Sequence, residues 1–174
     1  MSTFSDLNLN SISGRLGIER EGLLTPVLTL KDDLRVYGRL SYRRLISRTA
    51  LIESARRSYL ISRRTLLRRE LTITDHNDSS MIGIVNLGFV WNPISLTLID
   101  GTELKFGRTG PFSASRVWTI AGGFPVLNVR TRIFNISEPF NIEPLNSATS
   151  NIDYALLALL GVYLVHLHRK RAAR

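Results

Sequence analysis

Eleven arginines lie between Arg35 and Arg69, and they are the residues of this 174-residue chain whose type and density most clearly point to a chemical role. Glu53 is the only acid in that stretch, so the segment has eleven positive charges against one negative, whereas the rest of the chain is close to neutral. Planar guanidinium groups form paired hydrogen bonds with phosphate and carboxylate groups. The pattern predicts a surface for an anionic partner, with a solvated basic face as the alternative. The candidate anion- or phospholipid-binding residues are Arg43, Arg44, Arg56, Arg57, Arg63, Arg64, Arg68 and Arg69.

Histidines and acids give no comparable signal for catalysis or metal binding. His166 and His168 are two residues apart, so on a helix their side chains diverge and cannot share a metal. His76 lies within Asp75–Asp78, a run with the composition of a turn that is too short for a calcium-binding loop. The motifs of serine hydrolases, zinc proteases, P-loop proteins and dinucleotide-binding proteins are absent from the sequence. We therefore predict a protein that is not an enzyme and that has no cofactor and no metal site.

Composition indicates one globular domain in a reducing compartment. The hydrophobic content of 44% is ordinary for a folded protein of this length. The chain has no cysteine, which removes disulfides and palmitoylation and weakly favours the cytoplasm. The N-terminus has neither the basic start nor the apolar run of a secretory signal. We predict an irregular or flexible leader over residues 1–22, a single domain over residues 23–174, and a cytoplasmic location that is peripheral at a membrane surface if the arginines bind lipid.

Apolar residues that alternate with polar ones predict strands from Leu23 onward. Leu34, Val36, Leu40 and Tyr42 alternate with arginines, which predicts a strand with one buried and one basic face. Residues 81–91 are mostly apolar at both odd and even positions, which predicts a strand that is covered on both faces or bent at its glycines.

Two turn signals predict hairpins. Asp100-Gly101 lies between two alternating runs and is the strongest hairpin signal in the chain, and Gly122-Gly123 marks a second hairpin. Residues 42–67 are ambiguous, because good helix formers stand beside strand residues; we expect strands with a bulge or a single helical turn, with a helix as the alternative. About twelve short strands at this spacing imply an antiparallel sandwich or barrel.

The C-terminal segment Ile152–Leu167 predicts a helix that is apolar around its whole circumference. Ser150 or Asn151 is suited to cap its N-terminus, Asp153 lies in the first turn, and cations follow the apolar part. A surface helix keeps a polar face, so this one must be buried in protein or in lipid. Sixteen residues extend about 24 Å, whereas a bilayer core of about 30 Å usually requires about 20 residues. The length favours a helix over about residues 152–168 inside a β-barrel, with a membrane tail anchor as the alternative.

Three segments together resemble the tubby C-terminal-like superfamily, which includes the LURP-one-related proteins and the phospholipid scramblases. They are the hairpin Leu96–Phe106, the strand pair around LRRELTITDHND, and above all NIDYALLALLGVYLVHLHRKR. The resemblance covers about Leu23 to His168. It implies a closed antiparallel barrel of about twelve short strands around a central apolar C-terminal helix. It also implies phosphoinositide binding through basic residues, to which the arginine pairs correspond in charge only, while the cysteines and calcium loop of scramblases have no counterpart.

These patterns together predict a non-enzymatic, tubby-like binding protein that engages anionic phospholipid through its arginine-rich face. The alternative is a structural or protein-interaction module with an incidental basic surface. Nucleic acid is a less favoured partner, because Tyr37 is the one aromatic side chain expected on the arginine face, whereas single-strand binders interleave several. The sequence does not define the oligomeric state.

Overall fold

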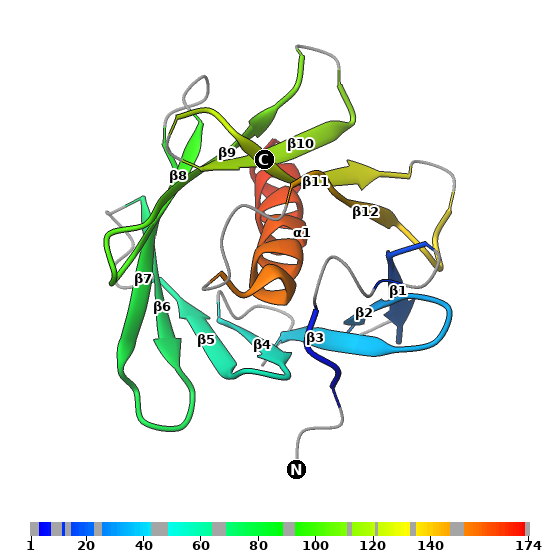
Figure 1. Cartoon of the computed structure of the whole chain (residues 1–174), viewed down its shortest axis with the longest axis horizontal. Coiled ribbons are helices and arrows are strands. Elements are labelled where there is room, and N and C mark those ends of the chain that lie inside the picture. The colour runs from blue at the N-terminus through cyan, green and yellow to red at the C-terminus, as the bar shows by residue number, and fades with distance from the viewer. Residues whose placement is uncertain are drawn as a thin grey trace.

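The computed structural model in Figure 1 is a closed antiparallel barrel of twelve strands with one helix inside it. It describes residues 4–7, 12, 15–22, 26–42, 49–63, 69–88, 93–110, 113–120, 122–132, 135–146 and 152–172. The strands are β1 (Gly17–Glu21), β2 (Val27–Lys31), β3 (Val36–Tyr42), β4 (Ala50–Ser54), β5 (Ser58–Ser62), β6 (Glu70–Asp75), β7 (Met81–Asn86), β8 (Ile94–Leu98), β9 (Glu103–Arg108), β10 (Ser115–Ile120), β11 (Pro125–Thr131) and β12 (Phe140–Pro144). The helix α1 is Tyr154–Ala172. The predicted mainly β fold with a C-terminal helix is confirmed.

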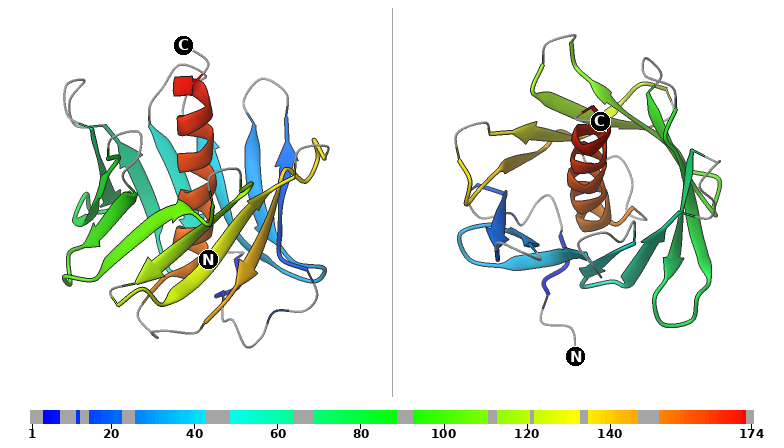
Figure 2. Two further views of the ribbon diagram at one scale, coloured as in Figure 1. Left: turned by 90° about the horizontal axis from the view of Figure 1, so that it is seen from above. Right: turned by 180° about the vertical axis from the view of Figure 1, so that it is seen from behind.

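Each strand pairs with its neighbours in sequence, and the barrel closes where β1 pairs with β12. This order needs no crossover, so every connection joins two adjacent antiparallel strands. Closure also leaves no strand edge open for pairing with another chain. In the left view of Figure 2, α1 stands upright with strands around it, so the helix runs along the barrel.

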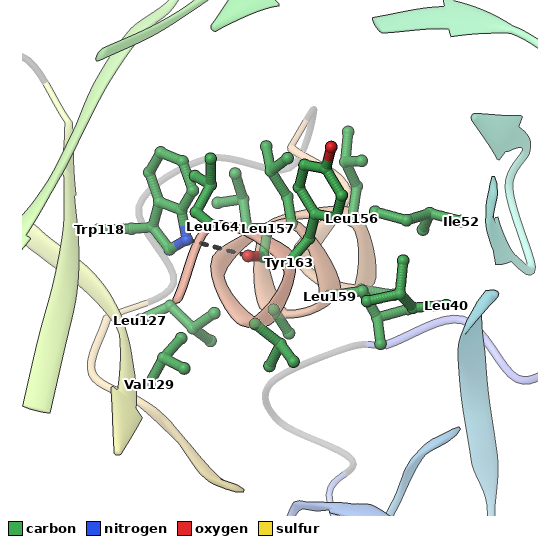
Figure 3. Packing of buried hydrophobic residues seen from close by; sticks show 14 of the residues in the cluster. Leu40, Ile52, Trp118, Leu127, Val129, Leu156, Leu157, Leu159, Tyr163 and Leu164 are labelled. Carbon is green, nitrogen blue, oxygen red and sulfur yellow. Dashed lines mark hydrogen bonds between the residues drawn. The ribbon is translucent and has the colours of Figure 1, made fainter. Parts of the chain in front are cut away.

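The helix is buried on all sides because its apolar side chains face the inward side chains of the strands. Ala158, Leu159, Leu160 and Val162 are each 0% exposed, and they belong to one continuous core with the strand residues. Figure 3 shows helix side chains that project in opposite directions, towards Trp118 and Leu127 on one side and Leu40 and Ile52 on the other. The prediction of a helix buried inside the barrel is therefore confirmed. None of the helices in the described ranges is long and apolar enough to cross a membrane.

Gly161 lets two strands approach α1 closely. A Cβ atom at this position would lie 3.0 Å from Val129 Cγ2 and 3.1 Å from Trp118 Nε1. The Trp118 indole N–H donates a 2.9 Å hydrogen bond to the backbone carbonyl of Leu157, one turn earlier on the helix (Figure 3). A side chain at position 161 would crowd this contact, so the glycine is required by packing rather than by helix propensity.

Asp153 fixes the beginning of α1 to the barrel wall. Its Oδ1 accepts a 3.1 Å hydrogen bond from the backbone N–H of Leu156, so Asp153 is the N-cap, and the expected cap at Ser150 or Asn151 is wrong. Its Oδ2 accepts hydrogen bonds from Ser54 Oγ at 2.7 Å and from Tyr59 Oη at 2.9 Å. Burial, followed by the charge of Asp153 and its hydrogen bond, raises the pKa of Tyr59. We call Ser54, Tyr59 and Asp153 the helix clasp.

A bulge in β3 changes which side chains of that strand face inward. Leu30 pairs with Gly38 and Lys31 with Val36, so Tyr37 is an additional residue and the alternation shifts there. Tyr37 is 0% exposed, and its hydroxyl donates a 2.6 Å hydrogen bond to Asp32 Oδ2. Burial and this bond raise the pKa of Tyr37 to about 12. Two expectations are wrong. The bulge removes Tyr37 from the arginine face, and Leu34, expected to be buried in the strand, lies in the turn before β3 and is 74% exposed.

The strand β7 also differs from its predicted environment. Met81 and Ile84 are each 39% exposed, so the strand is not covered on both faces. Its pairing with β6 shifts between Gly83 and Met81, so the strand is irregular beside Gly83, as expected for a glycine position. A barrel wall with a solvated outer face explains the difference, because apolar residues on that face have nothing to pack against. Residues 89–91 of the predicted strand lie outside the described residues.

The remaining strand predictions agree with the structure except at the N-terminal boundary. The two predicted hairpins form, with left-handed φ values at Gly101 (+85°), Gly122 (+89°) and Gly123 (+81°). Strands β4 and β5 confirm the strand interpretation over residues 50–62, whereas residues 43–48 and 64–67 lie outside the described part. The barrel begins at Gly17 rather than at Leu23, because the short apolar pattern of Leu16 and Ile18 is enough to bury β1.

Gly38→Ala is expected to destabilise the barrel. A Cβ atom there would lie 2.5 Å from the backbone oxygen of Glu53, so β3 and β4 would have to separate. The free energy of unfolding should fall by about 1–3 kcal/mol in chemical denaturation. The matched control is Gly107→Ala in β9, where the nearest atom to the new methyl group is Pro93 Cβ at 3.8 Å. Equal effects of the two substitutions would contradict the close approach.

Removal of the clasp acid is also expected to destabilise the fold. Asp153→Ala removes a helix cap and leaves two hydroxyl donors without their acceptor, so the free energy of unfolding should fall by roughly 2–4 kcal/mol. Asp100→Ala is the control, because this exposed acid accepts its 2.8 Å bond from the backbone N–H of Thr102 in a turn and does not contact α1. In a Tyr59→Phe background the effect of Asp153→Ala should shrink. Strict additivity of these two substitutions would show that the hydroxyl and the carboxylate act independently.

Candidate functional site: the basic end of the barrel

The contacts of α1 define two ends of the barrel. The clasp holds the helix start beside the connection between β4 and β5. Near the other end of the helix, His166 Nδ1 lies 3.0 Å from the hydroxyl of Tyr42, the last residue of β3, and the imidazole packs edge-on against Phe140 at 5.4 Å. Because the strands are antiparallel, the connections of the barrel lie alternately at the clasp end and at this second end.

The structure divides the arginines that the sequence groups together. Arg63 follows β5 and Arg69 precedes β6, so both lie at the end where α1 finishes. Arg56 and Arg57 join β4 to β5 at the clasp end, and β5 separates them from Arg63. The other four predicted residues lie outside the described residues: Arg43, Arg44, Arg64 and Arg68. The structure therefore places Arg63 and Arg69 at one end of the barrel and Arg56 and Arg57 at the other.

Arg56 and Arg57 have acidic partners at the clasp end. Arg56 Nε lies 3.0 Å from Asp6 Oδ1, and this hydrogen-bonded contact raises the pKa of Arg56. Arg57 lies at a longer distance of 3.8 Å from Asp75 Oδ2. The exposed pair of Arg56 with Asp6 adds little stability. The effect of both pairs on the surface is to neutralise positive charge at this end.

Further acids lie in the turns of the clasp end. Asp75 is the last residue of β6, Asp78 is in the connection from β6 to β7, and Asp100 is in the connection from β8 to β9. Hydrogen bonds from Ser80 hold the pKa of Asp78 below its ordinary value, and those from Thr102 do the same for Asp100. Both side chains are therefore anionic at neutral pH. The clasp end combines these acids with paired arginines, while Arg63 and Arg69 lie at the opposite end.

Two more arginines face each other at the end where α1 finishes. Arg116 of β10 is directly opposite Arg108 of β9 in the strand register. The preceding pair on the same inward face is Phe106 and Trp118, whose rings lie 4.7 Å apart and are buried. Side chains two residues apart on a strand share a face, so Arg108 and Arg116 continue this column towards the mouth of the barrel.

Arg169 of α1 completes a group of positive charges with this pair. Burial lowers the pKa of Arg116, and repulsion from Arg108 and then from Arg169 lowers it further. Arg116 is half-buried, whereas Arg108 and Arg169 are exposed. We call Arg108, Arg116 and Arg169 the inner arginine cluster, and we call the whole group, with Arg63 and Arg69, the basic end.

Sequence reasoning missed the inner arginine cluster, although part of its signal was present. Arg116 is two residues from Trp118 along the sequence, and Arg108 is two residues from Phe106 and four from Leu104. Because every second residue of a strand lies on the same face, this spacing marks each arginine as an inward residue at a strand end. The pairing of β9 with β10 and the position of Arg169 depend on the closed barrel, so the sequence alone could not bring the three together.

Other charged side chains form local pairs on β1 and β2 and in the connection from β11 to β12. Lys31 Nζ lies 2.6 Å from Glu19 Oε2, and Arg132 lies 2.7 Å from Glu138 Oε2. Both pairs border a shallow polar depression that also contains Asp32 and Asp33. Mixed charges of this kind give no net field, so the depression is not a candidate anion site.

Comparisons of the chain with family models, with curated proteins and with solved structures found no match. Within the described ranges, no group of three or more histidine, aspartate or glutamate side chains is placed to hold a metal ion. The candidate site therefore rests on the geometry and charge of the basic end.

Arg116→Met is expected to stabilise the protein. The substitution keeps an apolar stem and removes a half-buried charge that two other arginines repel. Because Arg116 is partly open to solvent, the gain in the free energy of unfolding should be a few tenths of a kcal/mol and at most about 1 kcal/mol. It should shrink in high salt, which screens the repulsion. The control Arg132→Met removes an arginine that pairs with Glu138 and should destabilise slightly, and a similar loss for Arg116→Met would assign Arg116 a structural role.

Proposed function

We propose that this protein is a non-enzymatic binding module whose basic end docks on an anionic phospholipid surface. The observation that carries the proposal is the separation of charge along α1. Arg63, Arg69 and the inner arginine cluster lie where the helix finishes, whereas Asp75, Asp78 and Asp100 lie at the clasp end. An arginine close to an anionic leaflet contributes about 1 kcal/mol to binding, so several at one end give useful affinity without a deep pocket.

Charge separation also orients the molecule. The field of a surface charge decays within about 8 Å at physiological ionic strength, so only the end nearest the membrane interacts strongly. The basic end is attracted and the acidic clasp end is repelled, which favours one orientation in which α1 is directed towards the lipid. The cytoplasmic leaflet has the negative surface potential that this model requires. We therefore propose a cytoplasmic protein that binds peripherally to that surface.

The proposal includes a relationship to the tubby C-terminal-like superfamily. The closed twelve-strand barrel around an apolar C-terminal helix supports it, because this is the arrangement that the sequence resemblance implies. A shared fold does not by itself carry a shared function. The lipid-binding proposal therefore depends on the charges of this chain.

Co-sedimentation with liposomes tests the proposal. The bound fraction should rise with the content of phosphatidylserine in phosphatidylcholine vesicles and fall with salt. The double variant Arg63→Gln/Arg69→Gln should bind roughly ten- to thirty-fold more weakly, at about 1 kcal/mol per arginine. The matched double variant Arg35→Gln/Arg57→Gln removes the same charge from exposed positions at the clasp end and should bind like the wild type.

Three outcomes would overturn the proposal. Equal binding to neutral vesicles would remove the electrostatic mechanism. Equal losses in the two double variants would show that total charge matters and the basic end does not. Retention of a cellular protein partner by Arg63→Gln/Arg69→Gln, without any lipid binding by the wild type, would favour the alternative of a protein-interaction module.

A further inference from the structure

We propose that the inner arginine cluster is a discrete site for one phosphate-class oxyanion. Arg116 and Arg108 lie opposite each other on β10 and β9, and Arg169 of α1 is near enough for its charge to act on Arg116. The three come from different elements that the closed barrel brings together. The site is distinct from Arg63 and Arg69, which follow β5 and precede β6.

The scaffold beneath the cluster is rigid. The rings of Phe106 and Trp118 lie 4.7 Å apart directly below the arginine pair, and the indole of Trp118 donates a 2.9 Å hydrogen bond to Leu157 of the helix. These contacts fix β9, β10 and α1 relative to one another. Guanidinium groups held on packed strands and on a helix have less freedom to lose when they bind an anion than groups on a loop.

The charge and shape of the cluster favour a phosphate over a carboxylate. A guanidinium group presents several N–H donors in a plane and binds either oxyanion with paired hydrogen bonds. Donors supplied from two strands and a helix suit the oxygens of a tetrahedral ion better than those of a planar one. A dianion also compensates more of the mutual repulsion than a monoanion. The expected ligand is inorganic phosphate or a phosphate monoester group, including one on a lipid.

This inference rests on the proposed function only where the phosphate belongs to a lipid, since the same end of the barrel would then meet the membrane. Free phosphate tests the site without any membrane. Binding of inorganic phosphate is measured by calorimetry and by thermal denaturation, with sodium chloride added to keep the ionic strength constant. Phosphate should raise the melting temperature of the wild type, and acetate at equal ionic strength should not.

Two variants and one control locate the phosphate. Arg116→Met and Arg169→Gln should each weaken phosphate binding at least tenfold. Arg169 is exposed, so its substitution leaves the core intact even if Arg116→Met proves difficult to fold. Arg57→Gln at the clasp end is the control and should bind phosphate like the wild type. Equal stabilisation by phosphate and acetate, or unchanged binding in both variants, would overturn the inference.

Vesicles then distinguish the two sources of phosphate. Phosphatidic acid presents a phosphate monoester and phosphatidylglycerol a diester, so the two are compared at equal vesicle charge. Preference for phosphatidic acid that disappears in Arg169→Gln would identify a lipid headgroup as the ligand. Phosphate binding in solution with no preference between the vesicles would identify a free phosphate compound. Vesicle binding that depends on charge alone, with no binding of phosphate in solution, would overturn the site and leave the proposed function standing.

Discussion

Burial of α1 is the constraint on which the rest of the structure depends. An apolar helix without a polar face must be surrounded, and a barrel of twelve strands surrounds it with inward side chains from all directions. Neither part is stable alone, because each covers the apolar surface of the other. Few polar side chains are buried in the described part of this interior, and Asp153 is one of them. Asp153 accepts bonds from the helix, from Ser54 and from Tyr59, so the one acid at the helix start also fixes its position against β4 and β5.

The core and the surface of the barrel have different roles. The side chains of α1 form one continuous core with inward side chains of the strands. The clasp end combines acids with arginines that have acidic partners, and the outside of β1 and β2 carries mixed charges. The end where α1 finishes is different, because Arg63, Arg69 and the inner arginine cluster gather there. The core thus explains stability, and the placement of arginines around the end of the core carries the functional proposal.

The sequence predicted the architecture well because hydrophobic period and turn chemistry are local. The two-residue alternation, Asp100-Gly101, Gly122-Gly123 and the all-round apolar helix each have one simple structural meaning. The errors occur where a single residue shifts a strand, as Tyr37 does in β3, or where a turn residue such as Leu34 has no neighbour to cover it. The arginines show the same limit. Arg56 and Arg63 are close in sequence and lie at opposite ends of β5, whereas Arg116 and Arg169 are 53 positions apart and interact.

The inner arginine cluster is the place where the structure departs from what stability alone would select. The inward position of Arg116 lies next to Phe106 and Trp118 along β9 and β10. An apolar side chain there would pack against these rings without any charge repulsion. A guanidinium group there is partly desolvated and is repelled by Arg108 and Arg169. Stored repulsion of this kind is relieved when an anion arrives, so the same charges that weaken the free protein strengthen its complex. Core contacts already fix the helix and both strands. The free energy released when the anion relieves the repulsion therefore adds to the binding affinity, because the protein does not have to rearrange.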